Sequence, residues 1–223
     1  MPAGVTMTIR RYFDSDALTL TTQVLACEPE APAEPGDGAT RFRVVLAETL
    51  FHPQGGGQRA DTGCIGEANV LHVAIEGDTV VHVTDRAVPA GAVSIEVDAA
   101  PRTLHARLHS AGHLIAYAAA TFGWRAVKGH HWPGEARVVM ERDADAREMD
   151  AQALADAVDA LVAAALPRVL TERDGMRMLA YGTLDASPCG GTHVADTAAV
   201  GAVTIARVKE KKGQLTVQYD VAA

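Results

Sequence analysis

The residues best suited to chemistry lie in two short motifs, one near the middle of the chain and one near its end. In the later motif, SPCGGTHV, Cys189 precedes His193 by four residues. This spacing fits a short metal-binding tract, a buried thiol beside a core histidine, or a Cys–His pair for nucleophilic catalysis. Taken alone, the motif leaves all three kinds of site open.

A second pair of residues narrows these alternatives. His109 and His113 stand four residues apart in a segment with helical periodicity, so both imidazoles lie on one helix face and can reach one ion. With Cys189 and His193 they supply nitrogen and sulfur donors, which suit zinc and do not suit magnesium or calcium. We therefore predict one zinc ion per chain, bound by these four residues.

Other histidines carry weaker signals. His105 lies one turn earlier on the predicted helix but drifts away from the metal-binding face. His72 and His82 fall in predicted strands and are interpreted as ordinary strand residues. His130 and His131 are expected in a loop, where a phosphate or base contact and plain solvent exposure both fit the sequence.

A run of glycines, GGGQ at residues 55–58, directly follows a predicted strand. It is not a phosphate loop, because the G-x4-G-K-[ST] spacing and its lysine are absent. Consecutive glycines expose backbone N–H and C=O groups and let a ligand approach closely. A flexible hairpin tip is the alternative interpretation of this stretch.

The elements that must position these residues change in kind near residue 100. The first half shows short apolar or alternating runs, and Gly77-Asp78 between two of them signals a hairpin, so we expect a small β-barrel. The acidic stretch at residues 28–39, rich in Pro and Gly, predicts a solvated loop. The predicted strands are residues 18–25, 40–51, 69–75, 79–83 and 93–97.

From Pro101 onward the apolar periodicity is helical. It predicts one helix over residues 101–122 and a second over about 145–166, which Pro167 ends. Further strands are predicted at residues 136–142, 177–182, 202–208 and 214–221. This mixture indicates an α+β fold with a β-barrel domain at residues 1–98, carrying the glycine run, and an α+β domain at residues 99–223.

The charge is distributed unevenly. The formal net charge is −8, with 6 Lys/Arg against 14 Asp/Glu in residues 1–100 and 14 of each in residues 101–223. An acidic surface repels phosphates, which disfavours broad binding of DNA or other nucleic acids. A phosphate-bearing ligand would nevertheless meet no net repulsion in the second half.

The composition also bears on the compartment. Apolar residues make up 48% of the chain, yet no run approaches the ~18 needed for a membrane span. The N-terminus shows no secretory signal, and three separated cysteines do not make a disulfide framework. We therefore expect a cytoplasmic protein without a membrane partner.

Three motifs occur in one order: GGGQ (55–58) followed by Asp61 and Gly63, HSAGH (109–113), and CGGTH (189–193). In this order and spacing they resemble the editing domain of alanyl-tRNA synthetase and its free-standing relatives, the AlaX-type trans-editing proteins. The resemblance covers nearly the whole chain. It implies an N-terminal barrel like those of translation factors, then a zinc-containing editing domain that hydrolyses serine or glycine wrongly esterified to alanine tRNA.

The resemblance also implies roles for individual residues. It makes His109, His113, Cys189 and His193 the zinc ligands, and it has Gly55, Gly56 and Gly57 with Gln58 position the acceptor end of the tRNA.

Ser110 stands where the family commonly has threonine, one residue past His109. Its hydroxyl is expected to face the cleft and hold the side-chain hydroxyl of the substrate, and the alternative is a small residue that only lets the helix pack. Expected phosphate contacts, for which a solvated hairpin is the alternative in the last three, are Arg125, Lys128, Lys209, Lys211 and Lys212.

Two other functions remain compatible with the residues. One is a non-catalytic tRNA-binding module with a structural zinc site, although such sites favour more cysteines than the single Cys189. The other is a cysteine hydrolase in which Cys189 is the nucleophile and a neighbouring histidine is the base. Metal content and chelator-sensitive activity distinguish the thiol enzyme from the zinc-dependent alternatives.

Overall fold

The computed structural model describes residues 7–30 and 40–222, so most of the predicted loop at residues 28–39 lies outside the described residues. The chain divides into two units. The first runs to Gly55 and resumes over Arg59–Arg102, and the second comprises Gly56–Gln58 and Thr103 onward. Most of the glycine run therefore belongs to the second unit, whereas we predicted it in the first, and Ala99–Arg102 belongs to the first unit.

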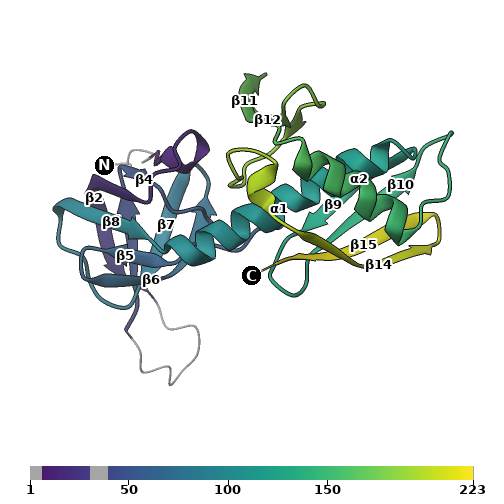
Figure 1. The fold of residues 1–223 in the computed structure, drawn as a ribbon. Coiled ribbons are helices and arrows are strands. Elements are labelled where there is room, and N and C mark those ends of the chain that lie inside the picture. The colour runs from purple at the N-terminus through teal and green to yellow at the C-terminus, as the bar shows by residue number, and fades with distance from the viewer. Residues whose placement is uncertain (1–6, 31–39, 223) are drawn as a thin grey trace. The chain divides into compact units, whose positions relative to one another are not determined.

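The first unit is a closed ring of antiparallel strands in the order β2-β3-β7-β6-β5-β8 (Figure 1). Closure leaves no unpaired edge and turns one face of every strand inward, where Val44, Ile65 and Ile95 are fully buried. The strands are β2 (Thr19–Pro29), β3 (Phe42–Leu46), β5 (Gly63–Ile65), β6 (Ala68–Glu76), β7 (Thr79–Thr84) and β8 (Gly91–Val97). The ring accords with the expected barrel, and its likeness to translation-factor barrels stays a prediction.

Two short strands and one helical turn complete this unit: β1 (Ile9–Arg10), β4 (Glu48–Thr49) and η1 (Arg11–Phe13). Asp61, which follows the glycine run, forms a buried ion pair with Arg102. The Asp61 carboxylate also accepts a hydrogen bond from the backbone N–H of His52 at 2.6 Å. The two ends of the segment that carries the glycines are thereby held together.

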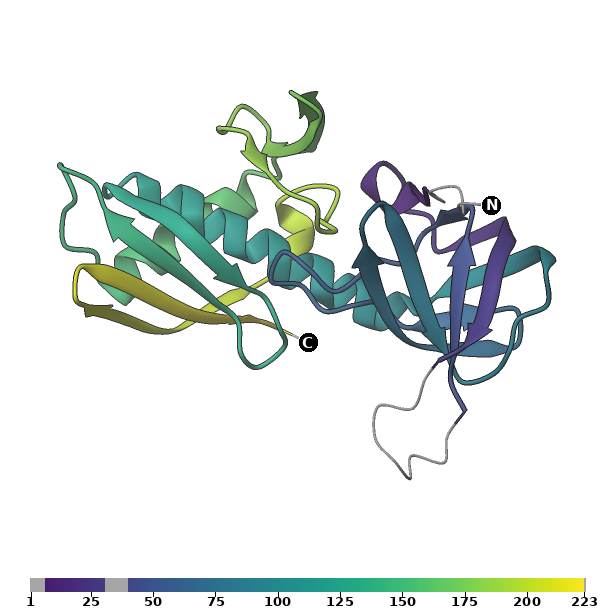
Figure 2. The same ribbon diagram turned by 180° about the vertical axis from the view of Figure 1, so that it is seen from behind.

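The second unit packs α1 (Ala99–Ala120) and α2 (Ala151–Ala163) against one face of a sheet, as Figures 1 and 2 show from opposite sides. The sheet has the order β14-β15-β10-β9, and all its neighbours are antiparallel. Alternation along β15 buries Leu215, Val217 and Tyr219 against the helices. The strands are β9 (Trp124–His130), β10 (Arg137–Arg142), β14 (Val203–Lys211) and β15 (Gln214–Val221).

A smaller sheet leads into the CGGTH segment (189–193). It is formed by β11 (Arg168–Arg173), β12 (Met176–Tyr181) and β13 (Ser187–Pro188), in that order. Cys189 follows β13 directly, so the pairing of β13 with β12 sets where the CGGTH segment begins. The turn η2 (Ala198–Val200) leads from this segment towards β14.

The structure confirms the mixed α+β class, both helices and most strands. The prediction that His130 lies in a loop is wrong, because it ends β9. The second helix is shorter than predicted, since the Asp150 carboxylate caps it by accepting from the backbone N–H of Ala153. Within the described residues, neither helix is both long and apolar enough to cross a membrane.

Candidate metal centre and adjoining cavity

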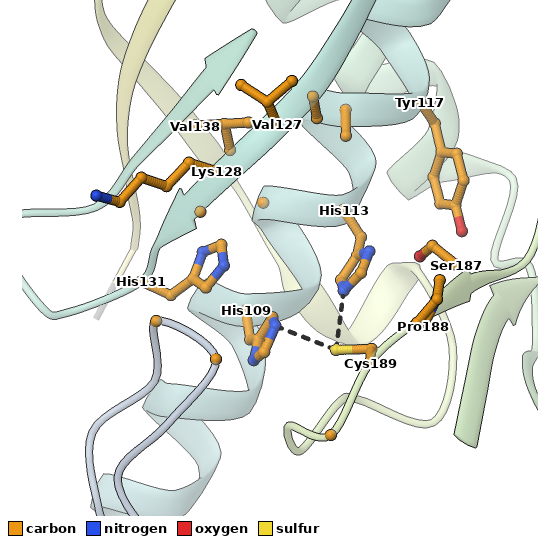
Figure 3. Close-up of a pocket in the computed structure, with 17 residues that line it drawn as sticks. His109, His113, Tyr117, Val127, Lys128, His131, Val138, Ser187, Pro188 and Cys189 are labelled. Carbon is orange, nitrogen blue, oxygen red and sulfur yellow. Dashed lines mark hydrogen bonds between the residues drawn. The ribbon is translucent and has the colours of Figure 1, made fainter. Parts of the chain in front are cut away.

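Four side chains converge at the centre of the second unit. One ligand atom from each of His109, His113, Cys189 and His193 lies within 4.8 Å of all the others. The two helix histidines point from consecutive turns of α1 toward the Cys189 sulfur, as Figure 3 shows. The four residues that the motif spacing predicted to share one site therefore do lie together.

The distances fit a tetrahedral metal centre. Each histidine Nε2 lies 3.4 Å from Cys189 Sγ. A tetrahedron with Zn–S of ~2.3 Å and Zn–N of ~2.0–2.1 Å has S···N edges of ~3.5 Å. The donor set and its spacing thus suit a borderline-soft metal ion.

Burial favours the uncharged forms of His113, His193 and Cys189. It lowers the pKa of His113 to about 4 and lowers the pKa of His193 well below its usual value. It also raises the pKa of the Cys189 thiol. Neutral imidazoles are the form that binds a metal, and a bound cation would offset the burial that disfavours the thiolate.

Gln58 fixes which nitrogen of His109 faces the cluster. The backbone N–H of Thr192 donates to Gln58 Oε1 at 3.0 Å, which identifies that atom as the acceptor. His109 Nδ1 lies 2.8 Å from the same oxygen and must therefore carry the proton. The lone pair of His109 is left on Nε2, directed at Cys189 Sγ, as in other metal sites with an outer-sphere partner.

Gln58 also links all three motifs. Its Nε2 donates to Thr192 Oγ1 at 2.8 Å, and the side chain is 1% exposed. We predicted that Gln58 positions the acceptor end of a tRNA, but the structure places its amide between His109 and the CGGTH segment. A buried amide at this position can orient His109, one of the candidate metal ligands.

The CGGTH segment is held tightly from two sides. A Cβ at Gly191 would lie 2.2 Å from the His109 ring, so only glycine fits there. From the other side, Arg177 donates to the carbonyl oxygens of Cys189 and Gly191, and Arg168 donates to that of His193 at 2.6 Å. These guanidinium groups fix the backbone that carries two of the candidate ligands.

A cavity of about 560 Å³ adjoins the cluster. His109, His113 and Cys189 line it, and so do Gly56 and Gly57 of the glycine run. Its opposite wall is largely apolar and includes Tyr117, Val127 and Val138 (Figure 3). Val127 is placed there by a β-bulge, because β10 pairs with residues 126 and 128 and skips it.

His131 is the main polar feature of this cavity that we did not predict as a site residue. It is buried, and its ring stacks on His109 with 4.3 Å between ring centroids. Burial lowers the pKa of His131 to about 3. Of the two alternatives for His131, solvent exposure is therefore wrong, whereas its position in the loop after β9 is as predicted.

Ser110 does not lie where we predicted. It is fully buried, and its Oγ accepts from Tyr181 Oη at 2.8 Å and from the backbone N–H of Val194 at 3.1 Å. It is not among the residues that line the cavity. The reason is helix geometry, since one residue past His109 is a rotation of about 100° away from the metal-binding face.

Of the predicted substrate contacts, Lys128 lines the cavity, but its ammonium group points away from the cluster (Figure 3). Arg125 is exposed and pairs with Glu141 at 3.1 Å. Gly55 is exposed and belongs to the first unit. The exposed Lys209, Lys211 and Lys212 lie on β14 and the turn that follows it.

The other histidines divide between the units. His82 is fully buried in the first unit, where its ring contacts Thr49 Oγ1 and the Val44 carbonyl, which confirms it as a strand residue. His105 is buried on α1 and is not one of the clustered donors. His72 lies in β6, as predicted.

Comparison with known proteins gives two kinds of match. Residues 176–216, which include the CGGTH segment, match the family model described as the threonyl and alanyl tRNA synthetase second additional domain. The chain is 38% identical over 138 residues to the alanyl-tRNA editing protein Aarsd1 of Rattus norvegicus, an alignment covering 58% of this chain and 33% of the relative.

Two further relatives extend the alignment. The alanine–tRNA ligase of Hyperthermus butylicus is 31% identical over 222 residues, covering 83% of this chain and 23% of the ligase. The alanyl-tRNA editing protein Aarsd1 of Danio rerio is 30% identical over 201 residues, covering 79% of this chain and 48% of that protein. The chain thus spans from 23% to 48% of the length of these relatives.

Proposed function

Because this chain is a homologue of the alanyl-tRNA editing proteins, we propose that it is an aminoacyl-tRNA deacylase that acts on wrongly charged alanine tRNA. The reaction would be hydrolysis of the ester that joins serine, or glycine, to the terminal adenosine. We further propose that the metal is zinc and that the amino acid removed is serine or glycine.

The observation that carries the proposal is the meeting of three distant motifs at one cavity. The glycine run, the α1 histidines and the CGGTH segment each contribute side chains or backbone to the same wall. His113 and Cys189 are only partly buried, so the cluster is open toward the cavity. A purely structural metal site is instead expected to be closed by protein on all sides.

The residues of the chain would divide the work. His109, His113, Cys189 and His193 would hold the metal, which supplies a Lewis acid able to polarise an ester carbonyl. Gln58 keeps His109 in the ligating tautomer.

The cavity volume of about 560 Å³ lies within the ~300–1,000 Å³ typical of small-molecule sites and exceeds the needs of an amino acid alone. We therefore assign the apolar wall near Tyr117 and Val127 to the nucleoside end of the substrate.

The test is deacylation of alanine tRNA charged with serine, glycine or alanine, measured with and without a chelator. We expect chelator-sensitive loss of the seryl or glycyl ester and slower loss of the alanyl ester. Tight binding of the charged tRNA without hydrolysis of any ester would favour the alternative, a tRNA-binding module with a structural metal. Hydrolysis that is unaffected by metal removal would instead favour a Cys189 hydrolase.

A further inference from the structure

In the part of the chain that the structure describes, four polar side chains line the cavity outside the proposed metal site: Tyr117, Lys128, His131 and Ser187. His131 enters the cavity at the end of β9, beside His109 in Figure 3. Its ring occupies a slot made by two glycines, since a Cβ at Gly112 would lie 2.5 Å from its Cε1 and one at Gly129 would lie 2.4 Å from its Nε2. Its backbone N–H donates to the Gly57 carbonyl at 2.8 Å. The position of this ring is therefore closely fixed.

The proton on the His131 ring is also fixed. Tyr219 Oη donates its only hydrogen to the Leu108 carbonyl at 2.9 Å. His131 Nδ1 lies 2.6 Å from the same Oη, so Nδ1 must be the donor in that contact. In the neutral ring Nε2 then carries the lone pair, and it has no hydrogen-bond partner among the residues that the structure describes. His131 Nε2 is thus a preset hydrogen-bond acceptor at the cavity.

An aminoacyl ester brings a matching donor to this place. Every such ester carries an α-amino group, which needs an acceptor once it leaves water. Among the described residues that line the cavity none is Asp or Glu, so no carboxylate is present to serve that need. Lys128 offers only donors.

We infer that His131 Nε2 binds the α-amino group of the aminoacyl ester, with Tyr219 as the positioning residue that sets the His131 tautomer. The inference rests on the proposed function and deepens it. His131 would then recognise the α-amino group, which all aminoacyl groups share. It lies close to the candidate metal cluster but is not one of its four ligands. The contact would hold the ester in one orientation whichever amino acid is attached.

The test compares two esters that differ by this group alone: a glycyl and an acetyl ester on the same acceptor-stem RNA. His131→Phe keeps the ring stacked on His109 and leaves Tyr219 bonded to Leu108. We expect it to lower kcat/KM for the glycyl ester by about 10–100-fold and to leave the acetyl ester nearly unchanged. His130→Phe is the matched control, since His130 does not line the cavity, and it should change neither rate.

A binding measurement gives a second readout. The non-hydrolysable amides 3′-glycylamino- and 3′-acetylamino-3′-deoxyadenosine would be titrated calorimetrically into wild-type and variant protein of equal metal content. We expect His131→Phe to weaken only the glycyl analogue. Tyr219→Phe, which removes the phenol but keeps His131, should show a smaller loss in the same direction because Nδ1 is no longer fixed as the protonated nitrogen.

The outcomes separate the inference from the function on which it rests. Equal losses for the glycyl and acetyl compounds, or no loss for either, would overturn the α-amino contact. A loss confined to seryl esters would also overturn it and would assign His131 to the serine hydroxyl. A wild-type protein that hydrolyses no aminoacyl ester would overturn the proposed function itself, and the inference with it.

Discussion

Gln58 Oε1 lies 2.8 Å from His109 Nδ1, so the residue that closes the glycine run orients the first histidine of the candidate metal centre. The same oxygen accepts from the backbone N–H of Thr192, which lies between Cys189 and His193 in the sequence. One buried amide therefore couples three motifs that lie far apart in the chain. The glycine motif therefore contributes to the candidate metal centre through Gln58.

We expect Gln58→Leu to weaken metal binding by about 10–100-fold, because loss of the outer-sphere acceptor frees the His109 ring. Gln58→Glu keeps an acceptor oxygen and should lose less. Metal affinity would be measured by competition with a chromogenic chelator. Gln54→Ala is the matched control, since Gln54 lies in the same segment with its side chain exposed. Unchanged affinity in Gln58→Leu would show that this contact does not support the metal.

Ser110→Ala should affect stability more than substrate choice. It leaves the buried Val194 N–H without its acceptor and Tyr181 Oη with only the longer contact to the Val194 carbonyl at 3.4 Å, and it should lower the free energy of unfolding by about 1–3 kcal/mol. Urea unfolding checks this, and Tyr181→Phe, which removes one donor, should cost less. We expect the ratio of seryl- to alanyl-tRNA hydrolysis to stay as in the wild type. A changed ratio would restore Ser110 as a discriminating residue.

His82 makes the stability of the first unit depend on pH. Burial lowers the pKa of His82 from its ordinary 6.5 to about 4. Between these values the unfolded chain binds a proton that the folded chain does not, so stability falls as the pH drops from about 6.5 toward 4, by up to roughly 3 kcal/mol. Above pH 6.5 both states are neutral and this contribution is constant.

The measurement compares wild type with His82→Gln in urea at several pH values, both with chelator present so that metal loss is equal. The variant lacks the titrating ring, so its stability should fall less steeply below pH 6.5. Parallel curves for the two proteins would mean that His82 is already accessible to protons in the folded state.

The exposed lysines of the β14 hairpin give a test of where tRNA binds. If Lys211 and Lys212 contact phosphates, replacing both with Ala should weaken tRNA binding and reduce the slope of log K against log salt by about 1 per contact. Filter binding over a range of salt concentrations measures this. Arg86→Ala, at an exposed site in the first unit, should leave the slope unchanged. An equal slope in the lysine variant would remove this hairpin from the interface.

Patterns that are strictly local allowed prediction of much of this fold. The alternation of β15 and the helical repeat of α1 each reflect one buried face, so their residues were identified from sequence alone. β9 was missed because most of its residues are exposed and a bulge interrupts its pairing, which leaves little alternation to read. β11 was missed because its apolar Val169 is exposed and its charged Arg168 is half-buried, so apolar residues do not mark one face of the strand.

The candidate metal ligands could be predicted from the sequence, but the residues that hydrogen-bond to the site histidines could not. Helical spacing places His109 and His113 together, and the short CGGTH motif carries its own pair. The partner of His109, Gln58, is 51 residues away and could not be identified by any periodicity. The Tyr219 contact to His131 spans 88 residues and depends on the register of β15, which sequence alone does not set.

The most direct test of the account is reconstitution of the metal-free protein with zinc. Hydrolysis of the seryl ester on alanine tRNA is followed as zinc is added. Activity should return in proportion to zinc and reach its maximum at one equivalent per chain. Cys189→Ala, which lacks the only anionic donor of the cluster, should bind zinc more weakly and recover little activity. Full activity of the metal-free protein, or of Cys189→Ala without bound zinc, would contradict the account.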